Sequence, residues 1–386
     1  MLRDRIKYVD KLIVFPYLAL TLFSIAMVYS ASSYSALHDY GNPHHYLPRQ
    51  VVFVLLSYGV FLTGLFVPIK LLKKKRMVQL GMVLTVISLI FVLFFGREIN
   101  GARGWIETPF FNIQPAELAK VMVIWYLAYI LSKKQQKIAE GYFKALVAPV
   151  ILVGFMVLII YIQPDTGTSF MIVLLTTIII FSSGVSPKLG VWTGLSGVGL
   201  IAGMSQLIRH FGTRLFFLNE YRYNRFLGFW DPFALAEGAG MQLVHSYYAL
   251  SRGGLFGVGF GNSVQKIGYL PFPYTDFIIS IVGEEFGLLG IFLLLSAFGL
   301  LVSRMFLTSI RSNKPFDSIL CVGMASLFLM QSLINIGGVI GLMPITGVTF
   351  PFISYGGTSL IVSSGALGLV ANVSVRVNYE KDKKKL

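Results

Sequence analysis

The fold of this chain is decided by the stretch Tyr269-Leu-Pro-Phe-Pro-Tyr-Thr-Asp-Phe-Ile-Ile-Ser-Ile-Val-Gly-Glu-Glu-Phe-Gly287, in which a polar loop becomes an apolar helix. From Phe277 the sequence stays largely apolar to residue 303, and about 20 apolar residues are enough to cross a bilayer. Asp276 therefore lies where water meets lipid. A carboxylate is costly at such a boundary, so we expect Asp276 to be kept for a function.

Similar apolar runs recur along the whole chain of 386 residues. Hydrophobic residues make up 55% of it and charged residues 13%, with a mean hydropathy of +0.73, which excludes an ordinary soluble domain. We predict an all-α integral membrane protein with ten transmembrane helices, forming a single polytopic domain over residues 1–386. The predicted spans are residues 12–30, 50–69, 77–95, 115–132, 145–162, 168–184, 189–207, 277–303, 316–340 and 357–375.

The basic residues orient the predicted helices. The formal net charge is +15, and 22 of the 32 Lys and Arg residues fall in the terminal segments or in alternate short loops. This bias predicts that both termini lie in the cytoplasm, and it suits contact with anionic membrane lipid. Because the charge follows the membrane topology, we expect no nucleic-acid partner.

Several kinds of chemistry lack their sequence signatures. There is no Gly-rich phosphate loop followed by Lys-Ser or Lys-Thr, which argues against ATP-driven transport. There is also no Gly-x-Ser-x-Gly nucleophile elbow. His44 and His45 have no spaced partners that would complete a metal site. The single cysteine, Cys321, lies in an apolar run and cannot form an internal disulfide.

The loops that carry distinctive motifs are all predicted on the outer side. The largest is the extracytoplasmic loop 208–276 between the seventh and eighth spans, far longer than an ordinary connection. It is rich in aromatic residues and arginines, Arg214 among them. Its glycines between positions 253 and 261 fit anion binding through backbone N–H groups, plain turns, or a re-entrant stretch packed on helices.

Two charged residues begin the fourth span. Glu117 and Lys120 are spaced i,i+3, so they share a helix face and can pair. One interpretation is that Lys120 binds an anionic group such as a diphosphate while Glu117 orients it. The other is a structural ion pair that holds the bundle together. Arg103 is predicted near the same outer level.

Two aspartates stand directly before apolar helices. Asp276 precedes Glu284 by eight residues, about 12 Å along a helix, which predicts a base at the mouth of a site and a second acid deeper in. Asp276 could equally cap the free N–H groups of the first helical turn. Asp165, in Gln-Pro-Asp-Thr-Gly-Thr, offers the same alternatives, and there we favour the cap.

Six ordered motifs resemble the signatures of the SEDS family of shape, elongation, division and sporulation proteins. The resemblance covers nearly the whole chain. It is closer to the division branch than to the elongation branch in the runs Val28-Tyr-Ser-Ala-Ser-Ser and Arg225-Phe-Leu-Gly-Phe-Trp-Asp231-Pro232. The six motifs are Asn100-Gly-Ala-Arg103-Gly-Trp105, Gln114-Pro-Ala-Glu117-Leu-Ala-Lys120, Gln163-Pro-Asp165-Thr-Gly-Thr, Gly259-Phe-Gly-Asn-Ser-Val-Gln265-Lys266, Leu270-Pro…Tyr274-Thr-Asp276-Phe and Pro344-Ile-Thr-Gly347…Pro351-Phe-Ile-Ser354-Tyr-Gly-Gly-Thr-Ser359.

The resemblance implies a peptidoglycan glycosyltransferase in a bacterial cytoplasmic membrane, which polymerises lipid II during cell division. Asp276 would be the general base, and undecaprenyl diphosphate would leave with inversion. A divalent cation, Mg²⁺ or Mn²⁺, could assist. The expected partners are lipid II, a class B penicillin-binding protein acting as transpeptidase, and divisome proteins. The substrate-binding candidates are Lys120, Glu117, Arg103, Arg214, Gln265, Lys266, Glu284 and Ser354.

The chain departs from the family pattern beside Asp276. Phe272 stands where the family often has Glu, and Tyr274 stands where it often has His or sometimes Tyr. This departure puts in doubt a mechanism that needs a second acid at position 272. Two other functions remain open on the sequence, namely a lipid II flippase and a non-catalytic scaffold for the penicillin-binding protein.

Overall fold

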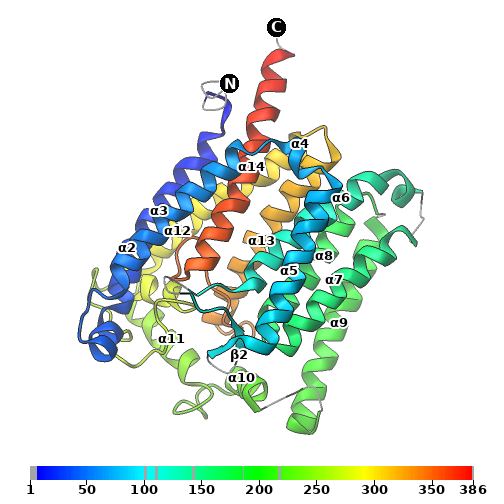
Figure 1. The fold of residues 1–386 in the computed structure, drawn as a ribbon. Coiled ribbons are helices and arrows are strands. Elements are labelled where there is room, and N and C mark those ends of the chain that lie inside the picture. Colours follow the sequence, from blue (N-terminus) through cyan, green and yellow to red (C-terminus); the bar gives the residue numbers. More distant parts are fainter. Residues whose placement is uncertain are drawn as a thin grey trace.

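A computed structural model of the chain describes residues 7–99, 102–108, 112–140, 144–185, 187–215, 218 and 220–384. Most of this part is helical, and it includes one short antiparallel hairpin (Figure 1). The elements are α2 (Lys11–Tyr40), α3 (Tyr46–Phe66), α4 (Ile69–Leu72), α5 (Lys75–Phe95), β1 (Arg97–Ile99), β2 (Ala102–Trp105), α6 (Pro115–Ala139), α7 (Lys144–Ile162), α8 (Thr166–Phe181), α9 (Pro187–Phe211), the 3₁₀ turn η1 (Gly212–Arg214), α10 (Glu220–Trp230), α11 (Met241–Gly253), α12 (Ile278–Arg311), α13 (Pro315–Val339) and α14 (Gly357–Lys383).

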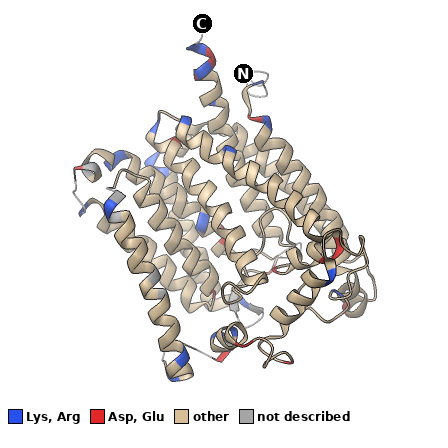
Figure 2. Cartoon of the chain, turned by 180° about the vertical axis from the view of Figure 1, so that it is seen from behind, with Lys and Arg blue, Asp and Glu red and all other residues tan. Residues whose placement is uncertain are grey.

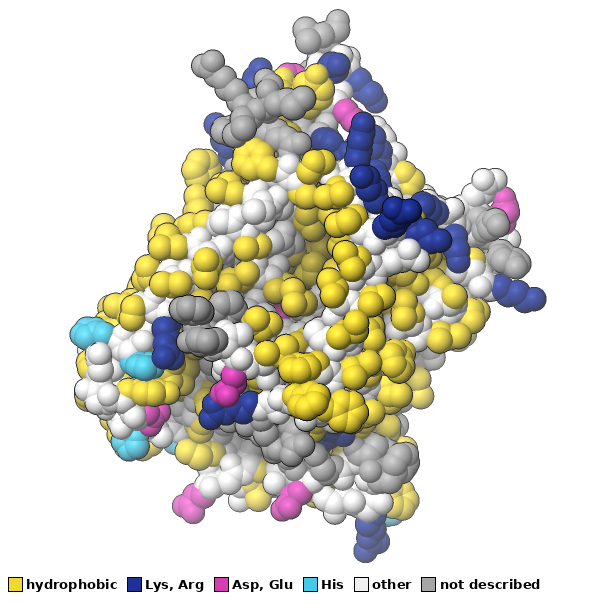
Figure 3. Space-filling view, viewed as in Figure 1, with side chains coloured by type: hydrophobic (Ala, Val, Ile, Leu, Met, Phe, Trp, Pro, Cys, Tyr) yellow, Lys and Arg dark blue, Asp and Glu magenta, His cyan; other side chains and the backbone are white. Residues whose placement is uncertain are grey.

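The long helices make this an all-α integral membrane protein. In the described residues, nine helices are long and apolar enough to span a membrane, and hydrophobic side chains cover the middle of the face shown in Figure 3. The nine are α2, α3, α5, α6, α7, α9, α12, α13 and α14. The remaining predicted span corresponds to α8, whose 16 residues rise by roughly 24 Å. The count of ten spans therefore stays a prediction.

Several helices continue past the predicted spans. The helix α2 runs on to Tyr40, where Gly41 adopts a left-handed conformation (φ 68°) and donates its N–H to the Leu37 carbonyl. A glycine in this position is a common way for a helix to end. Hydropathy marks only the apolar part of a helix, so it misses the polar turns at the ends. The predicted loop 208–276 likewise begins inside α9, and it contains α10 and α11.

The two ends of the bundle differ. Figure 1 shows both termini at one end, and α10, α11 and β2 at the opposite end. Figure 2 shows that charged residues are sparse along the middle of the helices. At the end with the termini, Arg304 binds Asp10 at 2.6 Å, and buried Asp317 pairs with Lys73 at 3.1 Å and Arg376 at 2.5 Å. These ion pairs connect α2, α12, α13 and α14 at this end of the bundle.

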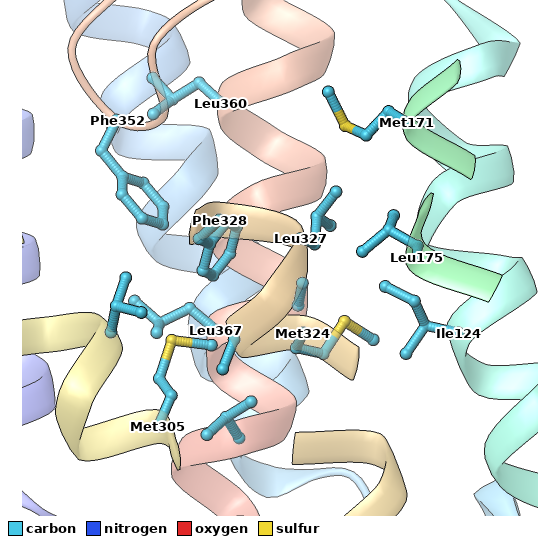
Figure 4. Close-up of a cluster of buried hydrophobic side chains, with 14 of the residues drawn as sticks. Ile124, Met171, Leu175, Met305, Met324, Leu327, Phe328, Phe352, Leu360 and Leu367 are labelled. Atoms are coloured by element: carbon cyan, nitrogen blue, oxygen red, sulfur yellow. The ribbon is translucent and has the colours of Figure 1, made fainter. Parts of the chain in front are cut away.

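The centre of the molecule is α13. In its most apolar stretch 72% of the residues are buried, against 6% in α9 at the edge of the bundle. Figure 4 shows Met324 and Phe328 of α13 among Ile124 of α6, Leu175 of α8 and Leu367 of α14. Polar side chains on α13 are therefore enclosed by other helices.

The helix α12 is broken at Gly287, which has a left-handed backbone (φ 68°). The break deprives the carbonyls of Glu284 and Glu285 of helical partners. The glycine-rich segment that follows α11 supplies them, because the N–H groups of Val258 and Gly259 donate to these two carbonyls, both at 3.0 Å. In a membrane such backbone groups must be satisfied within the protein.

The same segment also completes the second half of α12. The N–H groups of Leu288 and Leu289 donate to the carbonyls of Gly254 at 2.9 Å and Leu255 at 3.1 Å. Glycine is required here, because a Cβ on Gly257 would lie 2.2 Å from the carbonyl oxygen of Glu285. Of the three interpretations of the glycine-rich stretch, the structure shows the third, a segment packed backbone to backbone against a helix.

Candidate functional site

Asp276 lies two residues before α12, in the segment that joins α11 to α12. Its half-buried carboxylate accepts a hydrogen bond from the Thr275 hydroxyl at 2.7 Å. In the described part of the chain no other side chain donates to it. The N-cap of α12 is Phe277, and no side chain caps the first turn. The capping interpretation of Asp276 is therefore wrong, and its carboxylate is not used to begin the helix.

Burial changes the acidity of Asp276. It raises the pKa of this carboxyl above its ordinary value, and the hydrogen bond from Thr275 and the positive charge of Arg225 offset only part of the rise. A carboxylate with a raised pKa is a stronger base than an ordinary one. The environment of Asp276 therefore favours proton abstraction.

The backbone around Asp276 is fixed by distant parts of the chain. Asn335 of α13 donates from Nδ2 to the carbonyl of Asp276 at 2.7 Å and to that of Val348 at 2.8 Å. The N–H of Tyr355 donates to the carbonyl of Tyr274 at 2.8 Å. These bonds join the Asp276 segment to the α13–α14 loop (residues 340–356).

A small pocket adjoins Asp276. Its walls come from Asp276 and Phe277 just before α12, from the end of α13 and from residues 345–348 of the α13–α14 loop. Arg225 of α10 reaches this loop and donates from Nη1 to the Ile345 carbonyl at 2.9 Å. Gly347, with φ +75°, lies beside the guanidinium group of Arg225. A Cβ on Gly347 would be 3.6 Å from Arg225 Nη2. Arg225 therefore lies beside Gly347, which lines the pocket, and its positive charge acts to lower the pKa of Asp276.

Three tyrosines pack beside this segment. The hydroxyl of Tyr274 donates to that of Tyr46 at 3.2 Å, and their ring centroids are 4.8 Å apart. The ring of Tyr355 lies 5.1 Å from Tyr46 and 5.8 Å from Tyr274. Burial raises the pKa of Tyr274 and Tyr355, so these hydroxyls stay neutral. Tyr274, where the family often has His, is therefore part of an aromatic cluster.

Phe272 has an unusual backbone conformation. Its φ is +53°, and its side chain is 41% exposed. A left-handed conformation costs an ordinary residue about 1–2 kcal/mol, and such strain gathers at functional sites. Phe272 therefore presents an apolar ring to the surroundings, four positions before Asp276.

A second polar cluster lies at the beginning of α6. Lys120 Nζ contacts Glu117 Oε1 at 2.6 Å, and the two side chains are 2% and 10% exposed. The predicted pairing is confirmed. A buried ion pair is poor evidence for stability, because desolvation offsets most of the attraction. Both interpretations of the pair, structural and substrate-binding, remain open on this geometry.

Asp165 caps α8 as predicted. Its Oδ1 accepts from the N–H of Thr168 at 2.9 Å, and its Oδ2 accepts from Gln114 Nε2 at 3.1 Å. Burial raises the pKa of Asp165, while the bonds from Thr168 and the charge of Lys120 act in the opposite direction. Next to it, a Cβ on Gly167 would lie 3.0 Å from the Thr346 carbonyl oxygen. The turn that carries Asp165 and the Asp276 pocket therefore adjoin the same part of the α13–α14 loop.

Glu284 is buried and binds the glycine-rich loop, which here means residues 254–266 after α11. Its carboxylate accepts from Arg252 Nη1 at 2.8 Å, from Ser263 Oγ at 2.5 Å, and from the N–H groups of Val264 at 2.9 Å and Gln265 at 3.3 Å. The structure does not place Asp276 on the helix that carries Glu284, since α12 begins at Ile278. The carboxylate of Glu284 is therefore bound by this loop, and its role as a second acid stays a prediction.

Lys266 forms a second buried anchor. Its Nζ lies 2.7 Å from Glu285 Oε1, which also accepts from Ser30 Oγ at 2.6 Å. Gln265 Oε1 lies 2.8 Å from His245 Nδ1. These contacts hold the glycine-rich loop to α2, α11 and α12.

The remaining candidates lie elsewhere. Ser354 is buried and accepts from the N–H of Phe350 at 2.8 Å, within the α13–α14 loop. Arg214 is exposed in η1. Arg103 belongs to β2, but its side chain lies outside the described residues. Sequence reasoning missed Asn335, whose only signal is an amide within an apolar run.

Comparisons with known proteins agree with the resemblance. A family model described as "cell cycle protein", for FtsW, RodA and SpoVE, matches residues 10–379. The chain is 37% identical over 386 residues to the "Probable peptidoglycan glycosyltransferase FtsW" of Bacillus subtilis, covering 100% of this chain and 95% of that protein. A protein of the same name from Enterococcus hirae is 36% identical, with coverages of 97% and 94%.

Solved structures give the same result. A chain from "Structural coordination of polymerization and crosslinking by a peptidoglycan synthase complex" matches with a TM-score of 0.75 and 28% identity, over 96% of this chain and 99% of that one. The rod shape determining protein RodA of Thermus thermophilus matches with a TM-score of 0.65 and 27% identity, over 96% and 98%.

Proposed function

The chain belongs to the FtsW, RodA and SpoVE family of cell cycle proteins, and we propose that it polymerises lipid II into glycan strands during cell division. Relatives that match over nearly their whole length are named peptidoglycan glycosyltransferases, and this chain is a glycosyltransferase of the same kind. The finer proposal concerns its substrate, its catalytic base and its partner.

The observation that carries the proposal is the state of the Asp276 carboxylate. It lies beside a pocket, its pKa is raised by burial, and it does not cap the helix that follows. Its main chain is held by Asn335. A carboxylate that is held in place, and whose bond from Thr275 leaves it able to accept a further proton, suits a general base.

In the proposed reaction a hydroxyl of the acceptor sugar gives its proton to Asp276. The hydroxyl oxygen forms the new glycosidic bond at the anomeric carbon of the donor. The bond between that carbon and the diphosphate oxygen breaks, and undecaprenyl diphosphate leaves with the electron pair. One base and one good leaving group are enough for inversion, whereas retention by double displacement also needs a nucleophilic carboxylate.

The negative charge that develops on the diphosphate needs stabilisation. We assign this to Lys120, whose charge Glu117 balances in this structure, and to Arg103 and Arg214. Gln265, Lys266, Glu284 and Ser354 would act indirectly, because their bonds shape the loops around the substrate.

The proposal includes a divalent cation, Mg²⁺ or Mn²⁺, only as an accessory to the substrate. Among the described residues there is no group of three or more His, Cys, Asp or Glu side chains that could hold a metal ion. The described residues therefore do not form a resident metal site, and no step above depends on one.

We also propose the cellular setting. The chain is a multi-pass membrane protein, and we place it in the bacterial cytoplasmic membrane with both termini in the cytoplasm. The positive-inside distribution supports this orientation. One structural neighbour comes from a complex that couples polymerization to crosslinking. That supports a class B penicillin-binding protein as partner. We propose other divisome proteins as further partners.

The test is a glycan-strand assay of the purified full chain on lipid II, with and without the partner and each cation. We expect Asp276→Ala to polymerise roughly two to four orders of magnitude more slowly. Glu237→Ala, at an exposed acidic residue of the same large loop, is the control and should behave like the wild type. Near wild-type polymerisation by Asp276→Ala would overturn the assignment of the base.

The same preparation tests the two other functions. Lipid II scrambling in vesicles by wild type and Asp276→Ala, without any polymer, would favour a flippase. Polymer made by the chain alone would exclude a pure scaffold. Polymer made only in the presence of the partner would indicate catalysis that the partner activates.

A further inference from the structure

Two amide side chains project from the central helix α13 toward the α13–α14 loop. Gln331 and Asn335 are one turn apart, and they are 1% and 4% exposed. Gln331 donates from Nε2 to the Thr349 carbonyl at 3.1 Å. Asn335 donates to the Val348 carbonyl at 2.8 Å and also to the Asp276 carbonyl at 2.7 Å. The two amides hold the same loop, but only Asn335 reaches Asp276.

The orientation of the Asn335 amide follows from its partners. Both neighbours are backbone carbonyls, which only accept hydrogen bonds, so the NH₂ group must face them. The amide oxygen is then buried and has no partner among the described residues, and the same is true of Gln331. Removal of Asn335 leaves two carbonyls without its N–H donors and removal of Gln331 leaves one, so both changes should lower stability, the change at Asn335 by more.

The Asp276 segment depends on these contacts from outside. Phe277 has non-helical angles (φ −107°, ψ 17°), so the regular bonds of α12 do not extend to Asp276. Its carboxylate is bound by the adjacent Thr275, which moves with it. Asn335 is therefore the side chain that fixes the main chain of Asp276 relative to the pocket that both residues line.

We propose that Asn335 is a positioning residue for the glycosyl transfer, which sets the place of the Asp276 carboxylate by binding the main chain of Asp276 and Val348 at once. This inference rests on the proposed function, in which Asp276 is the base. A displacement of about 1 Å can cost a reaction roughly a hundredfold in rate. A structural amide would affect folding, whereas a positioning amide also affects the catalytic step.

The experiment compares Asn335→Ala and Asn335→Asp with Gln331→Ala in the full chain, assayed with its partner on lipid II. Asn335→Asp keeps the volume of the side chain and removes the N–H donors. We expect kcat to fall about a hundredfold for both Asn335 variants. Their KM for lipid II should stay within about threefold, since uniform binding is unaffected. Gln331→Ala should also lose thermal stability, because the Thr349 carbonyl loses its donor, while keeping kcat within about threefold of the wild type.

A second readout does not depend on activity. Hydrogen exchange of peptides covering residues 270–280 reports local opening around Asp276. We expect faster exchange there in Asn335→Ala than in the wild type, and unchanged exchange there in Gln331→Ala. This measurement supports or overturns the positioning role even if the chain makes no polymer.

The outcomes separate the two proposals. Wild-type activity in Asn335→Ala, or unchanged exchange over residues 270–280, would overturn the positioning role. An equal loss of kcat in Gln331→Ala would also overturn it, because the effect would then belong to the loop as a whole. Active wild type with inactive Asp276→Ala shows that the proposed function stands. Full activity of Asp276→Ala shows instead that the base was wrongly assigned.

Discussion

The junctions before α8 and α12 look alike in sequence but differ in structure. In each, a polar turn ends in an aspartate that is followed by an apolar helix. Asp165 caps α8 through the Thr168 N–H and also binds Gln114. Asp276 stands outside α12, caps nothing, and receives a hydrogen bond from Thr275.

The difference teaches what a structure must do to keep a carboxylate available. Asp165 fills its acceptors with bonds that begin a helix. At the second junction α12 starts one residue later relative to its aspartate, and Asn335 holds the main chain instead of the side chain. The carboxylate of Asp276 thereby stays in a defined place with capacity for another proton donor.

The largest expected effect separates the two aspartates by activity. Asp276→Asn keeps the shape of the residue and removes the base, so polymerisation of lipid II should fall by roughly two to four orders of magnitude. Asp165→Asn retains a good N-cap and should polymerise at close to the wild-type rate. A glycan-strand assay of both variants checks this. Equal losses of activity in the two variants would contradict the claim that only Asp276 takes part in the reaction.

A smaller effect concerns a third carboxylate, Glu285, which follows the second junction within α12. Lys266→Met leaves the buried charge of Glu285 without its cation, which should destabilise the protein by about 3–5 kcal/mol. The measurement is the unfolding temperature in detergent. The double variant Lys266→Met with Glu285→Leu should recover most of the loss. If the single variant melts like the wild type, the pair is not an anchor.

The cap itself gives the third effect. Asp165→Ala removes the acceptor for the Thr168 N–H, so the free energy of unfolding should fall by about 1 kcal/mol. The matching change Asp276→Ala removes no cap and should not show this loss. Thermal unfolding of both variants at neutral pH tests the difference. A greater loss of stability in Asp276→Ala than in Asp165→Ala would contradict it.

The smallest effect is one of pH. Burial raises the folded-state pKa of Asp276 above its ordinary value of 3.8. The folded state therefore binds the proton more tightly than the unfolded state, and this contribution to stability is lost as the pH rises through the folded pKa. Activity requires the charged form and should change in the opposite direction.

Two titrations measure this opposition. As the pH falls through the raised pKa, wild-type polymerisation should decline. Over the same range the melting temperature of the wild type should rise relative to that of Asp276→Asn, which cannot titrate. A melting difference that does not change with pH would show that the acidity of Asp276 is the same in the folded and unfolded chain.

Local patterns in the sequence predicted much of the architecture. The apolar runs located the long helices, because hydropathy directly measures the preference for lipid. The spacing of Glu117 and Lys120 predicted their ion pair, and Asp165 was correctly assigned as a cap. Each of these interactions joins residues within a few positions, so local sequence contains the information.

Contacts between distant residues could not be predicted in this way. Glu284 binds Arg252, 32 residues earlier, and Asn335 binds Asp276, 59 residues earlier. Spacing along a helix predicted that Glu284 lies on the same helix face as Asp276. The carboxylate of Glu284 is instead bound by the glycine-rich loop, which lies outside that helix. An amide within an apolar run signals a polar partner, yet nothing in one sequence identifies the partner.

The broken helix α12 has a consequence for biogenesis. The glycine-rich segment that completes its hydrogen bonds precedes it in the chain, so it has already been synthesised when α12 enters the membrane. The pocket beside Asp276 needs Asn335 and Val348, which leave the ribosome later. During N- to C-terminal synthesis, the glycine-rich segment can therefore complete the backbone hydrogen bonds of α12 as soon as α12 forms. It acquires the walls of its reaction site only after α13 and the following loop have been made.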